Sequence, residues 1–239
     1  MERAVAIPTF RTADSGAALI DVMPRERSEV VARIANTVIA AISLVLLAPL
    51  MVLIALAIRL TSRGPVIYTQ TRVGLDRRHN GLGIGHPSRQ HDFGGKLFTM
   101  YKFRTMCVDA EVDGRSVWAS VCDPRVTRVG QVLRKTRLDE LPQLWNVLLG
   151  EMNIVGPRPE RPDIFERLRE EVPGYALRQR VKPGITGWAQ VNQSYDTCLD
   201  DVRRKVELDL EYLGRQSVME DLLIMTRTLP VMVLRRGAW

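Results

Sequence analysis

The chain has few cysteines, histidines and aromatic residues for its length. Its 239 residues include 3 Cys, 3 His and 6% aromatic side chains. Three cysteines far apart in the sequence (Cys107, Cys122 and Cys198) cannot close a complete disulfide framework and form no pair at metal-ligand spacing, so we expect reduced thiols in a cytosolic compartment. The 46% apolar fraction excludes an intrinsically disordered chain, and the 13 Pro and 17 Gly follow no period, which excludes collagen. One main core is therefore expected.

Lysine is also scarce. Of the 34 basic residues, 5 are Lys and 29 are Arg, against 27 acidic residues, which gives a net charge of +7. Arginine binds phosphates and carboxylates with two parallel hydrogen bonds, so this bias indicates anion recognition beyond simple solubility. A basic chain suits nucleic acid, an anionic membrane surface or phosphorylated small molecules, and net charge does not choose among them.

One long segment carries no charge at all. Residues 34–58 are 25 consecutive uncharged, mostly apolar residues between Arg33 and Arg59. A helix of about 25 residues covers roughly 37 Å, which exceeds a hydrocarbon layer of roughly 30 Å. This length favours a membrane helix over residues 28–60 rather than the buried helix of a soluble core. The position and length of the run do not fit a cleaved signal peptide.

Two features bear on how this helix meets the membrane. Pro49 lies just past the middle of the apolar run, where it predicts a kink or a break. Arginines flank both ends of the run, and positive charge marks the cytoplasmic side of a membrane. A helical hairpin that enters and leaves from the cytoplasm is therefore favoured, and a helix that crosses the membrane stays open as the alternative.

The rest of the chain predicts a mostly α fold with a small β element, an α+β class. Residues 1–27 indicate a flexible N-terminal tail, and residues 61–239 indicate a cytoplasmic domain. Strands are expected at residues 66–73 and 97–106. Between them, a glycine-rich loop at 76–95 holds all three histidines and indicates a solvated insertion rather than a metal site. Helices are expected at residues 125–150, 162–178, 199–214 and 218–234, the last either interfacial or packed on the domain.

An acidic pair is the strongest candidate for chemistry. Asp139 and Glu140 lie within about one helical turn of three cations, Arg134, Lys135 and Arg137. Cations so close keep at least one carboxylate ionised and therefore able to act as a nucleophile or to bind a metal. The alternative is a solvated acidic pair that stabilises the N-terminus of a helix.

Two further segments present cations. Residues 156–159 (GPRP) hold Arg158 on a stiff loop, because each proline fixes its own backbone and extends the residue before it. Lys102 and Arg104 alternate along a predicted strand, so they would share one face and could meet an anionic substrate there. An ordinary surface turn is the alternative for the proline-rich loop.

Four sequence segments follow the apolar run in a fixed order: GPVIYTQTRVG, YKFRTM, LDELPQLWNVLLGEMNIVGPRP and KPGITGWAQV. From about residue 30 to its C-terminus the chain closely resembles the bacterial sugar transferase family of monotopic polyprenyl-phosphate phosphoglycosyl transferases. The resemblance implies transfer of a sugar 1-phosphate from a nucleotide diphosphate sugar, a UDP-sugar by expectation, to polyprenyl (undecaprenyl) phosphate. A nucleoside monophosphate would be released, and assembly of a surface glycan or exopolysaccharide would begin. The resemblance also implies a re-entrant helix in the bacterial inner (cytoplasmic) membrane, with the catalytic domain facing the cytoplasm.

The resemblance assigns roles to the acidic pair. It makes Asp139 the catalytic nucleophile, which carries an aspartyl-phosphosugar intermediate, and Glu140 its catalytic partner and a ligand of Mg²⁺. Our candidates for binding the substrate phosphates or the nucleotide are Lys102, Arg104, Arg137, Pro157, Arg158 and Pro159. Two features depart from the family pattern. The hairpin break has Ala48-Pro49 where the family usually pairs Ser with Pro, and the loop at 76–95 is longer than the usual turn.

Two other classes of protein compete with this interpretation. A catalytically silent membrane scaffold of the same fold is the leading rival. A nucleic-acid-binding protein is the second, and the 6% aromatic content, the lack of a recognisable recognition module and the membrane segment argue against it. We therefore expect a nucleotide diphosphate sugar, polyprenyl phosphate and membrane lipid as partners, and no nucleic acid. The sequence leaves open the sugar, the nucleotide base, the glycan pathway and the oligomeric state, and it is compatible with a homo-oligomer.

Overall fold

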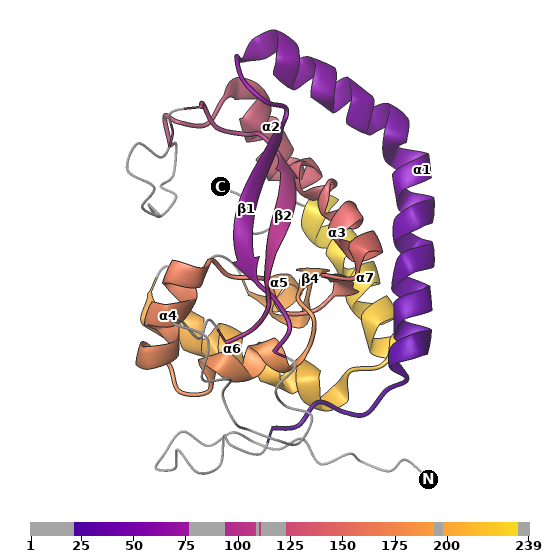
Figure 1. The fold of residues 1–239 in the computed structure, drawn as a ribbon, viewed down its shortest axis with the longest axis vertical. Coiled ribbons are helices and arrows are strands. Elements are labelled where there is room, and N and C mark those ends of the chain that lie inside the picture. The colour runs from indigo at the N-terminus through magenta and orange to yellow at the C-terminus, as the bar shows by residue number, and fades with distance from the viewer. Residues whose placement is uncertain (1–21, 77–93, 109, 111–122, 194–197, 234–239) are drawn as a thin grey trace.

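The computed structural model describes residues 22–76, 94–108, 110, 123–193 and 198–233 (Figure 1). Most of the predicted tail at 1–27 and of the predicted loop at 76–95 lies outside the described residues, as does Cys122. Cys107 and Cys198 are both free thiols, in agreement with the expectation.

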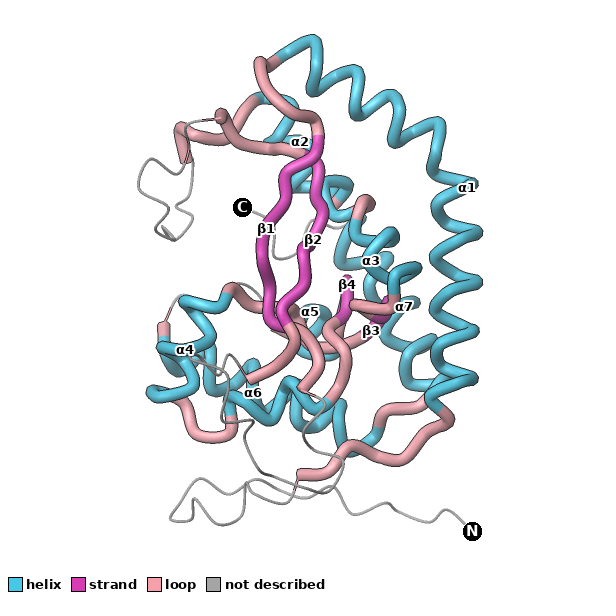
Figure 2. Tube along the Cα trace, in the orientation of Figure 1, coloured by secondary structure: helices cyan, strands magenta, loops and turns pink. Residues whose placement is uncertain are grey.

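Helices predominate in the described chain, and the strands form small sheets. The α-helices are α1 Glu29–Thr61, α2 Arg128–Thr136, α3 Gln143–Leu149, α4 Pro162–Glu171, α5 Trp188–Asn192, α6 Leu199–Arg215 and α7 Val218–Val233, and the 3-10 helices are η2 Leu138–Glu140 and η3 Tyr175–Arg180. The antiparallel pair is β1 Ile67–Val73 with β2 Leu97–Phe103, and the parallel pair is β3 Asn153–Val155 with β4 Gly184–Thr186. Figure 2 shows β1 and β2 as a long ribbon through the middle of the molecule. The predicted α+β class, mostly helical with small sheets, is confirmed.

The predicted helices at 125–150 and 162–178 are each shorter than expected. In the first, α2 ends at Thr136, because the left-handed backbone of the next residue, Arg137 (φ 58°), cannot continue a right-handed helix, and η2 and α3 follow as separate elements. In the second, α4 ends at Glu171, and Gly174 with a φ of 77° starts η3. The predicted strand pair and the last two helices are confirmed within a few residues.

Helix α1 is continuous through its proline. The Ser28 hydroxyl accepts the N–H of Val31 (3.3 Å) and caps the start of the helix, and all 33 residues Glu29–Thr61 are helical. The break predicted at Pro49 therefore does not interrupt the helix. Figure 1 shows instead that α1 bends as it follows the edge of the molecule. A proline removes one backbone hydrogen bond and displaces the turn before it, which bends a helix without ending it.

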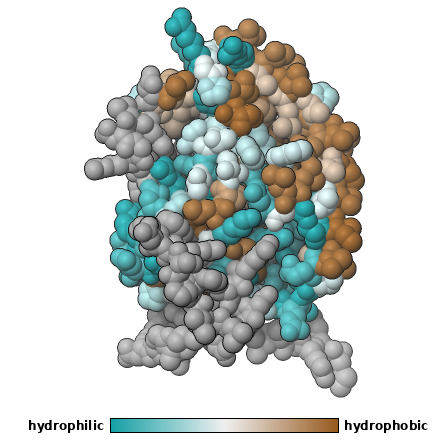
Figure 3. Space-filling model, in the orientation of Figure 1, coloured by the Kyte–Doolittle hydropathy of each residue, from teal (hydrophilic) through white to brown (hydrophobic). Residues whose placement is uncertain are grey.

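The two faces of α1 differ. By its length and composition α1 could cross a membrane, and most of its apolar length is exposed on the surface of the protein. Hydrophobic surface follows its edge of the molecule in Figure 3. The exposed apolar side chains of α1 include Val30, Ile34, Val38, Ile42, Val45, Leu46, Val52, Leu53 and Leu56. Apolar area of this extent on the outside of a protein marks an interaction surface rather than random exposure.

The inner face of α1 packs on the domain along its whole length. Near its start Ala32 is buried, and Ala40 joins a cluster with Phe98 and Met100 of β2. Near its end Ile54 and Ile58 pack with Phe103 and Leu133. Both ends of the helix therefore contact the same folded domain.

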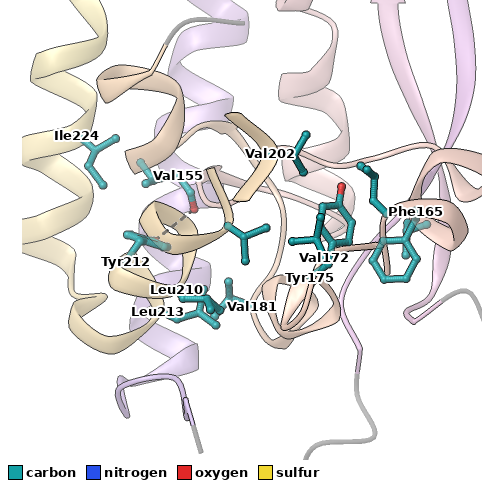
Figure 4. Close-up of a cluster of buried hydrophobic side chains, with 13 residues drawn as sticks. Val155, Phe165, Val172, Tyr175, Val181, Val202, Leu210, Tyr212, Leu213 and Ile224 are labelled. Carbon is teal, nitrogen blue, oxygen red and sulfur yellow. Dashed lines mark hydrogen bonds between the residues drawn. The ribbon is translucent and has the colours of Figure 1, made fainter. Parts of the chain in front are cut away.

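The largest core lies among α4, η3, α6 and α7. Figure 4 shows its side chains, with Phe165 and Tyr175 at one end and Tyr212 and Ile224 at the other. The rings of Phe165 and Tyr175 have centroids 5.5 Å apart and are tilted by 55°, an arrangement that aromatic pairs favour. Val155, the last residue of β3, belongs to this core, so the core adjoins the loop at 156–159.

The segment just before α1 is attached to this core. The N–H of Arg25 donates to the carbonyl of Leu213 (2.9 Å), and Arg27 forms an ion pair with Asp221 (3.0 Å). The predicted tail at 1–27 thus ends in a segment, residues 22–27, that contacts α6 and α7.

Candidate active site

The acidic pair is held by a tight reversal of the chain. Arg137 adopts its left-handed conformation after α2, and η2 then places Asp139 and Glu140 in the interior, with 8% and 6% exposure. The N–H of Glu140 donates to the carbonyl of Arg137 (3.2 Å) and closes the turn. The alternative of a solvated pair at a helix start is therefore wrong, because both carboxylates are buried.

Glu140 is held by two cations that come from distant parts of the sequence. Its Oε1 accepts from Lys102 Nζ (3.1 Å) near the end of β2 and from Arg158 Nη2 (2.8 Å) in the loop after β3. Both contacts use Oε1, so Oε2 lies outside these two pairs. The fold thus brings three of the predicted site residues together around one oxygen atom.

The two neighbouring carboxylates differ in their electrostatics. Burial alone would raise the pKa of Glu140, but the charges of Arg158, Lys102 and Arg137 hold that pKa well below its usual range. For Asp139 burial prevails and raises the pKa, against the opposing charge of Lys102. Neighbouring acids whose environments push their pKa values apart are typical of catalytic pairs.

Asp139 is the carboxylate that is left available. In the part of the chain that the structure describes, no hydrogen bond or ion pair engages its side chain, whereas Glu140 is doubly paired. A buried carboxylate without a fixed partner keeps its lone pairs for an incoming group. The geometry therefore gives Glu140 a fixed charge and leaves Asp139 able to react.

The proline-rich loop at 156–159 is rigid and inside the protein. Pro157 and Pro159 are buried, and three carbonyls of the loop are held: Gly184 N–H donates to that of Pro157 (2.9 Å), Arg178 Nη2 to that of Arg158 (3.1 Å) and Arg72 Nη1 to that of Pro159 (3.0 Å). The surface-turn alternative is therefore wrong. The backbone of Arg158 is fixed while its side chain reaches Glu140.

A second layer of charges behind this loop was not predicted. Glu160 pairs with Arg72 (3.3 Å) and Lys205 (3.8 Å), and burial, which would raise its pKa, is outweighed by these cations. Arg72 also donates to Gln70, whose amide donates to the Tyr68 hydroxyl (3.2 Å). The sequence did carry a signal for this layer. Tyr68, Gln70 and Arg72 alternate along β1, and residues two apart share a face of a strand.

Arg104 takes a different place from the one expected. Its Nη2 donates to the carbonyl (2.9 Å) and the hydroxyl (2.6 Å) of Ser62, which ends α1, and the residue is 5% exposed. Strand β2 ends at Phe103, so the common face expected for Lys102 and Arg104 is not maintained. In this structure Lys102 meets the acidic pair and Arg104 holds the end of α1.

The remaining cations lie around the acidic pair. Arg137 immediately precedes η2, and its charge lowers the pKa of Glu140. Arg134, one turn earlier in α2, donates through Nε to the Thr105 hydroxyl (3.0 Å), and its charge acts on Asp139.

The donor set suits a magnesium ion only together with substrate oxygens. Within the described residues no group of three or more His, Cys, Asp or Glu side chains could hold a metal. The loop histidines His79, His86 and His91 lie outside the described residues. Mg²⁺ at phosphate-binding sites is commonly held by one or two carboxylates plus phosphate oxygens and water. Asp139 and Glu140 supply two adjacent carboxylates, and the Oε2 of Glu140 lies outside its two ion pairs. This pair meets the requirement for one or two carboxylates.

The described residues place a buried acidic pair on a short 3-10 turn, paired with Lys102 and Arg158, in a domain that packs against a long apolar helix. The chain belongs to the bacterial sugar transferase family, whose family model matches residues 27–235.

Named relatives make the comparison specific. The chain is 44% identical over 198 residues to the UDP-glucose:undecaprenyl-phosphate glucose-1-phosphate transferase of Escherichia coli (strain K12). The aligned residues make up 82% of this chain and 39% of that protein. The chain is 41% identical over 199 residues to the UDP-N-acetylgalactosamine-undecaprenyl-phosphate N-acetylgalactosaminephosphotransferase of Aeromonas hydrophila, 83% of this chain and 43% of the relative. A UDP-glucose:undecaprenyl-phosphate glucose-1-phosphate transferase of Caulobacter vibrioides is 37% identical over 220 residues, 91% of this chain and 75% of the relative. The chain thus spans about two fifths of the first two relatives and three quarters of the third.

Proposed function

We propose that this protein transfers a sugar 1-phosphate from a UDP-sugar to undecaprenyl phosphate, releases UMP and so initiates assembly of a surface glycan. One observation carries the proposal: Asp139 is buried and has no hydrogen-bond or ion-pair partner among the described residues, beside Glu140, which two cations hold ionised. The names of the relatives support the substrate classes.

The chemistry takes two steps at phosphorus. A carboxylate oxygen of Asp139 attacks the phosphorus that bears the sugar, and the bond from that phosphorus to the bridging oxygen breaks, so UMP leaves with the bond electrons. An oxygen of the lipid phosphate then attacks the same phosphorus, and the carboxylate of Asp139 departs unchanged. Each step exchanges one P–O bond for another, so no oxidant or further reactant is required.

The surrounding residues bind and orient the charged groups. Lys102 and Arg158 lie 3.1 and 2.8 Å from Glu140 Oε1, and the charges of both also act on Asp139. Phosphoryl transfer depends mainly on such positioning and charge compensation. Glu140 and the phosphates of the donor would hold Mg²⁺, which when bound neutralises charge on the diphosphate and on the leaving group.

We also propose that α1 is re-entrant, with both of its ends on the cytoplasmic side of the inner membrane and the catalytic domain there as well. Support comes from the contacts of its inner face, since Ala40 and Ile58 pack against the same domain, at Phe98 and Phe103 of β2. One domain lies on one side of a bilayer, so contacts with it along both halves of α1 support a helix that returns to the side from which it entered.

Single-cysteine labelling tests this topology. In a background without the native cysteines, Glu29→Cys and Arg63→Cys place thiols at positions on either side of the apolar run. A membrane-impermeant maleimide should label both in inverted vesicles and neither in intact spheroplasts. Labelling of the two sites from opposite sides would establish a crossing helix and contradict the proposal.

A panel of donors tests the activity. Purified protein with undecaprenyl phosphate and Mg²⁺ should release UMP from one or more of UDP-glucose, UDP-N-acetylgalactosamine and UDP-galactose, and the lipid should acquire the sugar phosphate. A chelator should stop the release, and added Mg²⁺ should restore it. No release from any UDP-sugar would favour the catalytically silent scaffold.

A further inference from the structure

Asn36 is a buried polar side chain within the apolar helix α1. Its exposure is 6%. Its Nδ2 donates to the carbonyl of Ala32 in the same helix (2.7 Å), and its Oδ1 accepts the N–H of Ile154 (2.6 Å) in β3. A buried amide is stable only when its groups are paired, so this side chain joins α1 to β3 by a contact that an apolar residue cannot replace.

Asn36 takes the place of a neighbouring strand for β3. Successive N–H groups along a strand point to opposite sides, and that of Asn153 donates to the carbonyl of Pro183 (2.9 Å) beside β4. The N–H of Ile154 therefore points to the other edge of this two-stranded sheet. The Oδ1 of Asn36 in α1 accepts this N–H, which would otherwise lack a partner strand.

Arg33, one turn earlier on α1, makes a second attachment. Its Nη1 and Nη2 donate to the carbonyls of Val147 (2.5 Å) and Leu148 (2.6 Å) at the end of α3. The last carbonyls of a helix lack partners further along it, and a cation at a helix C-terminus is favourable. One turn of α1 thus contacts both the end of α3 and the middle residue of β3.

Both attachments lead to the same ion pair. Glu140 directly precedes the turn into α3, and Arg158 follows β3 in the rigid loop. The 2.8 Å contact between Arg158 Nη2 and Glu140 Oε1 joins the two segments that Arg33 and Asn36 hold.

We propose that Asn36 is a positioning residue for the transfer reaction: by holding β3 it keeps Arg158 in register with Glu140. The inference rests on the proposed function. Asn36 touches none of the reacting groups and acts through β3 alone. Correct seating of the membrane helix on the domain thereby becomes a condition for an assembled active site.

Substitutions of Asn36 test the link. Asn36→Leu keeps the size but leaves the N–H of Ile154 buried and unpaired, and kcat should fall about 10- to 100-fold with a smaller change in the KM of the donor. Asn36→Asp keeps an oxygen that can accept the N–H of Ile154 but loses the donor to the carbonyl of Ala32, so it should restore only part of the activity. Thr37→Val is the matched control. The hydroxyl of Thr37 donates to the carbonyl of Arg33 inside α1 (2.8 Å), so its loss should change kcat little.

A double-mutant cycle separates positioning from general destabilisation. If Asn36 acts through Arg158, adding Asn36→Leu to an Arg158→Gln variant should cause little further loss of kcat. Losses that multiply would show that Asn36 acts elsewhere and would overturn the proposal. If Asn36→Leu does not fold, Asn36→Asp takes its place in the cycle with Arg158→Gln, and losses that multiply there have the same consequence.

Hydrogen exchange gives a readout that does not depend on catalysis. Asn36→Leu should speed amide exchange in peptides covering residues 153–159, and Thr37→Val should not. If the wild type releases UMP from no donor, the proposed function fails, and exchange still tests the contact. Unchanged exchange in the Asn36→Leu variant would overturn the positioning role itself.

Discussion

Replacing Asp139 by asparagine is expected to lower the rate of sugar-phosphate transfer by about 10⁴-fold or more, as loss of a nucleophile does in other covalent enzymes. The neutral amide matches the carboxylate in shape but does not attack phosphorus. The partners of Glu140, Lys102 and Arg158, are left untouched, so the surrounding charges should stay in place. UMP release at saturating donor and acceptor measures the loss.

Folding and activity should respond to this substitution in opposite ways. Burial raises the pKa of Asp139, so at a pH above that raised value the ionised carboxylate destabilises the folded state relative to the unfolded one. Removing the charge should therefore leave the melting temperature at least as high as that of the wild type. The control Asp163→Asn changes a carboxylate that is 49% exposed on α4 and should alter neither quantity.

The proposed covalent intermediate offers a direct readout of the same prediction. With a donor labelled in its sugar phosphate and no lipid acceptor, label should accumulate on the wild-type peptide that contains Asp139 and be absent from the Asp139→Asn variant. Substantial transfer by that variant, or label on another residue, would contradict the assignment of the nucleophile.

Short local patterns in the sequence supplied the candidate residues at the centre of this site. Two adjacent acids among cations made Asp139 and Glu140 candidates, and two prolines around Arg158 predicted a rigid loop. Those features depend on near neighbours in the chain. The meeting of Lys102 with Glu140 followed only from the fold, although strand alternation placed Lys102 on the correct kind of element.

What the sequence did not reveal depends on long-range contacts or on special backbone conformations. Helix α2 ends where Arg137, a residue other than glycine, adopts a left-handed backbone conformation, and no local pattern marked this position. Strands β3 and β4 have three residues each, too few for a period of two to be recognised. The place of Arg104 at the end of α1 follows from where β2 stops, and strand boundaries are the least certain part of a sequence-based assignment.

The largest expected loss of stability comes from the buried ion pair of Arg178 and Asp209. The pair is 2.6 Å apart at side-chain exposures of 0% and 2%, and Arg178 also lies 4.9 Å from the ring centroid of Tyr175. Burial would lower the pKa of Arg178, but the charge of Asp209 more than offsets it and raises that pKa. Asp209→Leu leaves a buried guanidinium without its counter-charge and should lower the free energy of unfolding by about 3–5 kcal/mol.

Denaturant unfolding of the full chain in detergent measures this change, and two comparisons isolate its cause. Asp200→Asn breaks an exposed ion pair with Arg203 on the same helix, where the acid is 83% exposed, and should have an effect near zero. An Arg178→Met and Asp209→Leu double variant should recover much of the lost stability, because it removes both buried charges.

The same pair links stability to the active site. Arg178 Nη2 donates to the carbonyl of Arg158, so a displaced guanidinium releases the loop that positions the partner of Glu140. The double variant should therefore be stable yet slow, since methionine restores packing but cannot hold that carbonyl. A double variant with wild-type kcat would show that the prolines, Arg72 and the N–H of Gly184 keep the loop rigid without Arg178.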